Sequence, residues 1–523
     1  MTDEKNSISA QQKELDEVNA QLKELVDVDR RVITRKETIS FMLYDGSSGF
    51  NIDGHKELFV NGTLQIGLKR QSLYNVIGGI WDIVDDFAVS AIIEKTRTRW
   101  GKFVPYLFLG GLPYALVCSL YWLLPNFFSD SVIADQNAMS KFVAYMAVDM
   151  LIEFLGNFRN VAVGGYLSTI TPYPSDRRRL LSVSSYCKII YSRIPDLIVE
   201  FMLDFIQHGI IKSADKASGI NKALMTMGPA TSLISGAIVT WYSTMAKERV
   251  HQKVEAPKLR DSIRIVFSNR PVLMYMLSNA LGSFGTGFST NDYYRTVLFM
   301  TTFETFAGIP SFFFQPIGFS KYNVLAAKFS TKSLFMISQV FAKAFYIPLW
   351  FYGRFLHTKD GKYFFQGIWP MLPVTAVWEC IYATFWGVKS ISGTEIGNEC
   401  NDYIEWKCGY RNEATLAAAS TLICKIPGRI NGILEPLYKD WIGYDITAYN
   451  NGKEQPIAAQ KWIFAMCTLI TALLVATSMI PMFWYNIDKD MRDRMYCELN
   501  ERRVANAERI NREHEAEVAA ATE

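Results

Sequence analysis

Long apolar segments separated by short polar ones recur along most of the 523-residue chain. A transmembrane α-helix needs about 20 mainly apolar residues, and this hydropathy pattern predicts about twelve spans. The first span and the region of the seventh and eighth contain Gly, Ser and Asp, so we expect interrupted helices there. The pattern therefore predicts an all-α membrane protein. The expected spans lie at roughly residues 37–59, 70–94, 104–125, 139–171, 180–208, 222–246, 271–300, 303–326, 332–356, 365–400, 412–436 and 460–486.

The loops between these spans alternate in charge. Basic loops such as 95–102, 177–179 and 247–270 are expected in the cytoplasm by the positive-inside rule. An even number of spans then places both termini in the cytoplasm. The longest basic loop falls near the middle of the chain, and we interpret it as a linker between two six-helix halves. We expect a multi-pass protein of a plasma membrane, the bacterial cytoplasmic membrane, with these parts: tail 1–36, bundle 37–246, linker 247–270, bundle 271–486 and tail 487–523.

Composition and charge narrow the function classes. A formal net charge of +3 over 523 residues is too small to indicate nucleic acid as a partner. The eight cysteines show no CxxC spacing, so no zinc site is expected. Residues 1–36 lack the apolar core of a signal peptide. We expect neither an enzyme nor a bound cofactor. An intramembrane aspartyl protease, the enzyme class considered, is discounted because its Gly-x-Gly-Asp tetrapeptide does not occur. The expected partners are the lipid bilayer, a small solute and a cation, with the chain as a monomer.

The second span carries three acids inside an apolar helix. Asp82, Asp85 and Asp86 stand at positions i, i+3 and i+4, so they share one helix face. A charge at the centre of a membrane helix costs about 3 kcal/mol by insertion scales. A bound cation or partial protonation would offset this cost, because close carboxylates do not all ionise easily. We therefore predict a cation site there, with Asp82 and Asp86 as metal ligands. The alternative is pairing with a Lys or Arg of another helix.

Polar side chains also follow the fourth, fifth and eleventh spans. Such stripes must face protein or water rather than lipid, so they predict either a cavity wall or an interhelical ion-pair network. Counted from the helix ends at about 1.5 Å per residue, Asn160 and Lys425 lie about 16 and 20 Å inside the bilayer. Secondary carriers place solute and ion sites at that depth. The predicted solute-binding residues are Asn157, Asn160, Lys188 and Lys425.

Two charged turns, one in each half, are candidates for cytoplasmic gates. Glu405 is predicted to pair with Arg97 or Arg99 when the cytoplasmic side closes. The alternative is that these basic residues only anchor the topology. The full set of predicted gate residues is Arg97, Arg99, Trp100, Glu405 and Arg411.

In combination, these segments resemble the glycoside–pentoside–hexuronide:cation symporters of the major facilitator superfamily, typified by melibiose permease. The resemblance covers roughly residues 40–486. It implies coupling to sodium, lithium or protons through Asp82 and Asp86, with Lys425 close by. It also implies a major-facilitator-like fold of two six-helix bundles that rock about a central site. The segments that carry it are Trp81-Asp82-xxx-Asp86, Thr96-Arg97-Thr98-Arg99-Trp100-Gly101-Lys102-Phe103-Val104-Pro105-Tyr106, Thr169–Arg177, Asn401–Glu413 and Lys425.

The solute half of the family's site differs in this chain. Asn160 stands where the family's sugar-binding carboxylate is expected, and Gly164 replaces the stacking tryptophan. The family's helix-five arginine falls near Ser185, and its helix-one aspartate has no clear match, although Asp45 and Asp53 lie nearby. The acid at Asp85 replaces an Asn of melibiose permease. The resemblance thus implies cation coupling more specifically than it implies any particular sugar.

The predicted function is symport of a small polar solute with sodium or protons by alternating access. The cargo expected from the resemblance is a glycoside or another carbohydrate. Lys188 and Lys425 favour acidic glycosides, unless Glu153 and Asp196 neutralise them. Other cargoes on the same fold remain open, namely a nucleoside, an organic anion or a lysophospholipid, as does a non-transporting receptor or scaffold. The polar stripes count against a lipid cargo.

Overall fold

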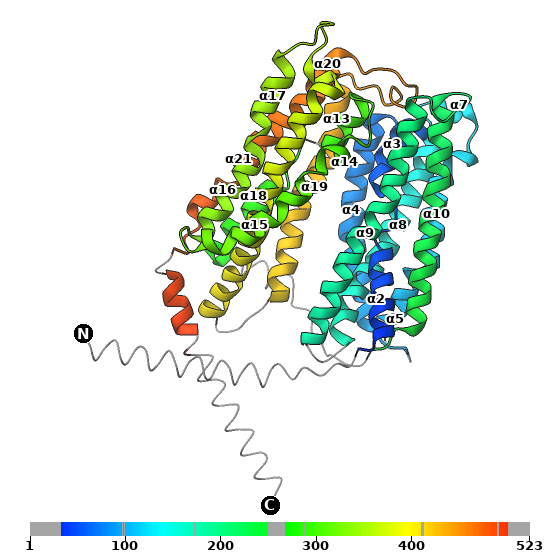
Figure 1. The fold of residues 1–523 in the computed structure, drawn as a ribbon. Helices are drawn as coiled ribbons and strands as arrows, with labels where there is room; N and C mark the ends of the chain where they lie inside the picture. The colour runs from blue at the N-terminus through cyan, green and yellow to red at the C-terminus, as the bar shows by residue number, and fades with distance from the viewer. Residues whose placement is uncertain are drawn as a thin grey trace, which may run out of the picture. The chain divides into compact units, whose positions relative to one another are not determined.

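Every regular element drawn in Figure 1 is a helix. The computed structural model describes residues 33–96, 98, 100–170, 174–248, 267–286, 288–408, 413–488, 491–499 and 501. Strand-like pairing within these ranges is limited to two isolated bridges, Thr98–Gly101 and His357–Tyr363. The expected tail 1–36 and linker 247–270 lie largely outside the described residues.

The chain forms two compact units. The first comprises Met1–Ile66 with Ile77–Val254, and the second comprises Gly67–Val76 with Glu255–Glu523. The helices of the first unit are α2 (Arg35–Ser47), η1 (Asp53–His55), α3 (Lys56–Leu58), η2 (Phe59–Thr63), α4 (Leu68–Lys95), α5 (Val104–Leu109), α6 (Leu112–Leu123), η3 (Leu124–Phe127), α7 (Asp130–Ala134), α8 (Met139–Thr169), α9 (Pro174–Gln207) and α10 (Lys216–Met245), where α4 begins in residues grouped with the second unit.

The first membrane segment is interrupted, as its glycines and serines predict. Helix α2 ends at Ser47, and a short turn follows in which Asn51 Nδ2 donates to the Ser48 carbonyl at 3.2 Å. The Asp53 amide then donates to Asn51 Oδ1 at 3.0 Å, and η1 begins. This local side-chain bonding offers the backbone an alternative to continued helix. Gly49 also lets α9 approach closely, because a Cβ there would lie 2.8 Å from Ser192 Cβ.

Helices α6 and α10 pack against each other through small residues. A Cβ on Gly236 would clash with Ala115 Cβ, and one on Gly228 would clash with the Trp122 ring. Small residues let two helix backbones approach closely, which is the usual basis of packing inside a membrane. This contact fixes the position of α10 beside α6 and therefore shapes the space between them and α2.

The second unit also contains an interrupted membrane helix. Helix α12 ends at Gly282, and α13 begins only at Thr290, capped by Ser289, whose Oγ accepts from the Asp292 amide at 3.1 Å. The helices of this unit are α12 (Arg270–Gly282), α13 (Thr290–Thr296), α14 (Phe303–Gly308), α15 (Ser311–Ala326), α16 (Thr331–Ala344), α17 (Tyr346–Phe355), η4 (Phe364–Gln366), α18 (Ile368–Cys408), α19 (Glu413–Trp441), α20 (Ile457–Ala465), η5 (Met466–Ile470), α21 (Thr471–Ser478) and η6 (Pro481–Trp484).

A short C-terminal helix, residues 491–499, packs on the second unit. Its Met495 and Leu499 side chains are buried in an apolar cluster formed with α12, α16 and α18. Tyr496 donates to Asp402 Oδ2 at 3.2 Å. Burial, together with the Asp402 carboxylate, raises the pKa of the Tyr496 hydroxyl, so this group stays protonated and keeps its donor role.

Five helical segments within the described ranges are long and apolar enough to cross a membrane by length and composition. Helices α4, α8 and α9, with 28, 31 and 34 residues, are also long enough to cross a membrane. They are less apolar than these five segments because they carry the charged and polar side chains of the candidate site. The five apolar segments are Val104–Phe127, Lys216–Met245, Thr331–Phe355, Ile368–Lys407 and Ile457–Trp484.

Candidate functional site

The three acids of α4 form one cluster, as their spacing predicts. Ligand oxygens of Asp82, Asp85 and Asp86 all lie within 4.8 Å of one another. Asp82 and Asp85 are 6% and 1% exposed, and Asp86 is half-buried. The α4 backbone is oriented by Trp81, whose indole Nε1 donates to the Met150 carbonyl of α8 at 3.3 Å. The carboxylates therefore lie at the contact of α4 with α8.

Asn157 of α8 completes this cluster. Its amide nitrogen donates to Asp85 Oδ1 at 2.9 Å and to Asp86 Oδ1 at 3.2 Å. One NH₂ group thus bridges two carboxylates and uses both of its hydrogens. Asn157 was predicted to bind the solute, and the structure places it against the acids.

The chemistry of this cluster suits a hard cation or a proton. Carboxylate and amide oxygens are the ligands that hard metal ions prefer. Ionised carboxylates this close repel one another, so a bound cation or an acquired proton lowers their energy. The residues present therefore fit an ion that is carried as cargo, and they offer no thiolate or imidazole ligand that would favour zinc.

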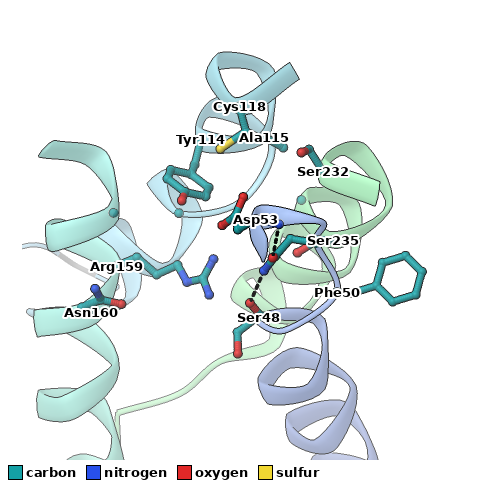
Figure 2. A pocket seen from close by; sticks show the side chains of 14 residues that line it. Ser48, Phe50, Asp53, Tyr114, Ala115, Cys118, Arg159, Asn160, Ser232 and Ser235 are labelled. Carbon is teal, nitrogen blue, oxygen red and sulfur yellow. Dashed lines mark hydrogen bonds between the residues drawn. The ribbon is translucent and has the colours of Figure 1, made fainter. Parts of the chain in front are cut away.

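A polar cavity of about 210 Å³ lies elsewhere in the first unit. Figure 2 shows it between the break after α2 and the helices α6, α8 and α10. Asn160, a predicted solute-binding residue, is exposed and lines this cavity. The lining residues are Ser48, Phe50, Asn51, Asp53, Gly110, Tyr114, Ala115, Cys118, Gly156, Arg159, Asn160, Ser232, Ser235 and Gly236.

The two predicted lysines are placed differently. Lys188 of α9 pairs with Asp45 of α2 at 3.7 Å between Nζ and Oδ1, and the two side chains are 52% and 19% exposed. The sequence suggested Glu153 and Asp196 as acids that could neutralise Lys188, whereas the structure pairs it with Asp45. Lys425 is half-buried on α19 in the second unit.

Most of the predicted gate falls on residues that the structure does not describe. Arg97, Arg99 and Arg411 lie outside the described residues. Trp100 is 62% exposed, and Glu405 is half-buried near the end of α18. The pairing predicted for Glu405 stays a prediction.

Sequence reasoning missed Glu248, which holds the turn before α5. Its carboxylate accepts from the Lys102 amide at 2.9 Å and from the Phe103 amide at 2.7 Å. It also accepts from the Val104 amide at 3.1 Å, so it satisfies the open N–H groups at the start of α5. A single Glu more than 140 positions away in sequence gives no local signal of this role.

Arg159 and Asp53 were not predicted as site residues, yet both line the cavity. Arg159 stands two positions after Asn157, which turns it about 200° around α8 and away from the acidic cluster. It therefore fell outside the polar stripe that the sequence suggested. Asp53 was noted only as lying near the expected position of the helix-one acid.

Comparison with known proteins extends these findings. Residues 48–489 match the family model described as "MFS/sugar transport protein". The inner membrane symporter YicJ of Escherichia coli (strain K12) is 21% identical over 463 residues, 86% of this chain and 91% of that protein. The isoprimeverose transporter of Lactiplantibacillus pentosus is 20% identical over 488 residues, 91% of this chain and 93% of that protein.

Among solved structures, a D-xylose-proton symporter matches with a TM-score of 0.52 and 14% identity, over 87% of this chain and 97% of that chain. At this identity the likeness shows the fold alone, and it agrees with the all-α, major-facilitator-like bundle of about twelve helices in two halves that the sequence predicted. This chain therefore belongs to the MFS/sugar transport protein family, within the glycoside–pentoside–hexuronide:cation symporters of the major facilitator superfamily, and is a multi-pass membrane transporter.

Proposed function

We propose that this chain carries a small polar solute, a glycoside or another carbohydrate, together with sodium or a proton by alternating access. The observation that carries the proposal is the cluster of Asp82, Asp85 and Asp86, two of them buried and one half-buried, with Asn157 bridging two of them. A bound cation or protons would offset the cost of placing three acids inside a membrane helix. The names of the full-length relatives, a symporter and an isoprimeverose transporter, support the same class of function.

Helix α8 supports the coupling of ion to solute. Asn157 contacts the carboxylates, and Asn160, three residues further along, lines the cavity. Three residues of α-helix correspond to a rise of about 4.5 Å. A cation that draws the carboxylates together would pull on Asn157 and hence shift the α8 residues that face the solute. Coupling of this kind is reciprocal, so bound solute would tighten the cation to the same degree.

The remaining parts of the proposal concern the second half and the gates. Lys425 of α19 is proposed as a solute-binding residue of the second unit. The turns that hold Arg97 and Glu405 are proposed as cytoplasmic gates. Both termini are proposed to face the cytoplasm, because the basic loops do so under the positive-inside rule.

The test uses purified chain in proteoliposomes, with solute counterflow and gradient-driven uptake measured side by side on a panel of sugars, nucleosides and lysophospholipids. Asp82→Asn and Asp86→Asn should each abolish sodium- or proton-driven accumulation and leave counterflow measurable. Asp130→Asn is the matched control, since Asp130 is an exposed acid of the same unit outside the cluster. Full accumulation by both cluster variants would refute the cation site. Absence of counterflow with every sugar would refute the cargo class.

A further inference from the structure

Arg159 is a charged side chain inside the first helix bundle, and no acidic side chain pairs with it among the residues that the structure describes. It lies ten residues before Thr169, the last residue of α8, which is about 15 Å along the helix. Within the described residues its guanidinium makes no ion pair or hydrogen bond, and its contact is the Tyr114 ring, 5.7 Å from Cζ to the ring centroid. An arginine at such depth is costly and marks a binding or transport role by default.

The packing around Arg159 aims its head group into the cavity. A Cβ on Gly110, at the junction of α5 and α6, would lie 2.8 Å from Arg159 Cγ and 2.9 Å from its Cβ and Cδ. The absence of a side chain at Gly110 thus leaves room for the arginine stem. Figure 2 shows the guanidinium pointing across the cavity toward the Asp53 carboxylate. The packing of the Arg159 stem against Gly110 therefore fixes the direction in which the guanidinium points.

The acid on the opposite wall already has a cation. Lys56 Nζ lies 3.2 Å from Asp53 Oδ1. The cavity also holds the hydroxyl groups of Ser232 and Ser235, of which Ser235 donates to the Ser47 carbonyl at 2.7 Å. The cavity thus offers one guanidinium that lacks an anion, one carboxylate that has its cation, and several groups that bond to hydroxyls.

We propose that Arg159 makes this cavity the receptor for the carboxylate of a single-ring sugar acid, with Asp53 and Asn160 bonding to the sugar hydroxyls. The inference rests on the proposed transport function and deepens it by assigning the solute a charge and a site. A cavity of about 210 Å³ is smaller than the roughly 300 Å³ of drug-sized pockets, which suits one sugar ring. Guanidinium and carboxylate bond in a bidentate, charge-assisted geometry. A phosphate dianion fits less well, because Asp53 faces the same space.

The sequence suggested that Lys188 and Lys425 recognise the acidic group of the solute. In this cavity Arg159 can bind that group without either lysine. Lys188 has its own carboxylate partner in Asp45. Arg159 instead carries the charge requirement, because the hydroxyl groups of a neutral sugar would offer its guanidinium only uncharged acceptors. Arg159 is half-buried, so its guanidinium is partly removed from water, and a charge-assisted bond to a carboxylate stabilises it more than a bond to a neutral hydroxyl does.

The cavity contains its own reporter, the thiol of Cys118. Alkylation of Cys118 by N-ethylmaleimide is followed by site-resolved mass spectrometry on the purified full chain, with exposed Cys497 as the internal control. The probes are two matched series: D-glucuronate, D-glucose and D-glucose 6-phosphate, and the three corresponding galactose compounds. We expect a uronate to slow labelling of Cys118 at concentrations at least about tenfold below those of its neutral and phosphorylated counterparts, with no effect on Cys497.

Variants then assign the effect to the guanidinium. Arg159→Gln should raise the half-protecting uronate concentration at least about tenfold, whereas Arg159→Lys, which keeps the charge, should lose less. Arg193→Gln is the matched control, because Arg193 already pairs with Glu200 at 3.1 Å, and it should change nothing. If Arg159→Gln does not fold, the proposal is still tested by comparing how well uronates and neutral sugars protect Cys118 in the unmodified protein.

Equal protection by neutral sugars, protection by phosphates alone, or no protection by either uronate would overturn the proposal. These outcomes are separable from failure of the transport function. Cation-driven uptake of neutral sugars without uronate protection would leave symport standing and remove the acid site. Uronate protection that depends on Arg159, with uptake indifferent to sodium and pH gradients, would keep the site and remove the coupling.

Discussion

Replacement of Asn157 by alanine tests the cation cluster most directly. The amide of Asn157 holds Asp85 and Asp86 at 2.9 and 3.2 Å, from a helix other than the one that carries the acids. Asn157→Ala removes both bonds and leaves all three carboxylates in place. The cluster would then lose the group that fixes its geometry, while its three carboxyl groups remain.

The expected size of the effect follows from the distances. Two ionised carboxylates at the 4.8 Å limit of the cluster repel by roughly 3.5 kcal/mol at an effective dielectric constant of 20. A hydrogen bond to a charged group contributes about 1.5–3 kcal/mol. Without the amide, this repulsion pushes the acids apart or favours protonation of one of them. Even if water replaces one of the two bonds, loss of the other weakens cation binding by about tenfold or more.

The assay is the sodium and pH dependence of solute uptake in proteoliposomes. Asn157→Ala should raise the half-maximal cation concentration at least about tenfold, with counterflow retained. Asn221→Ala is the control, since Asn221 accepts from Thr63 at 2.8 Å in the same unit. An unchanged cation dependence in Asn157→Ala, with a normal response in the control, would refute the role of this cluster.

Two further predictions concern packing. Gly110→Ala should displace the Arg159 stem and weaken uronate protection of Cys118 at least about tenfold. Gly308→Ala is the control, because a Cβ there would meet nothing within 4 Å and Gly308 lies in the second unit; equal effects of the two variants would contradict the positioning role. Leu499→Ala should cost about 2–5 kcal/mol of the free energy with which the C-terminal helix docks, measured as a loss of hydrogen-exchange protection in that helix. The control Cys497→Ala changes an exposed side chain and should keep the protection. Unchanged protection in Leu499→Ala would show that docking of the helix does not depend on this contact.

The sequence alone determined the class of fold and the location of the acids. Apolar length is a local property, so the spans could be read from it, and the breaks after α2 and α12 follow from local Gly, Ser and Asn chemistry. The spacing of Asp82, Asp85 and Asp86 placed them on one face because helix periodicity alone fixes that relation. The structure confirms their proximity.

Tertiary structure decided the partners of these side chains. The rotation of α8 about its axis sets Asn157 against the acids and turns Arg159 to a cavity on the other side. Helical period gives the angle between two residues but not which neighbour each one meets, because that depends on how the helices pack. The pairing of Lys188 with Asp45, rather than with the Glu153 or Asp196 that the sequence suggested, has the same origin. Sequence thus determined which groups lie in the membrane, and packing determined which of them meet.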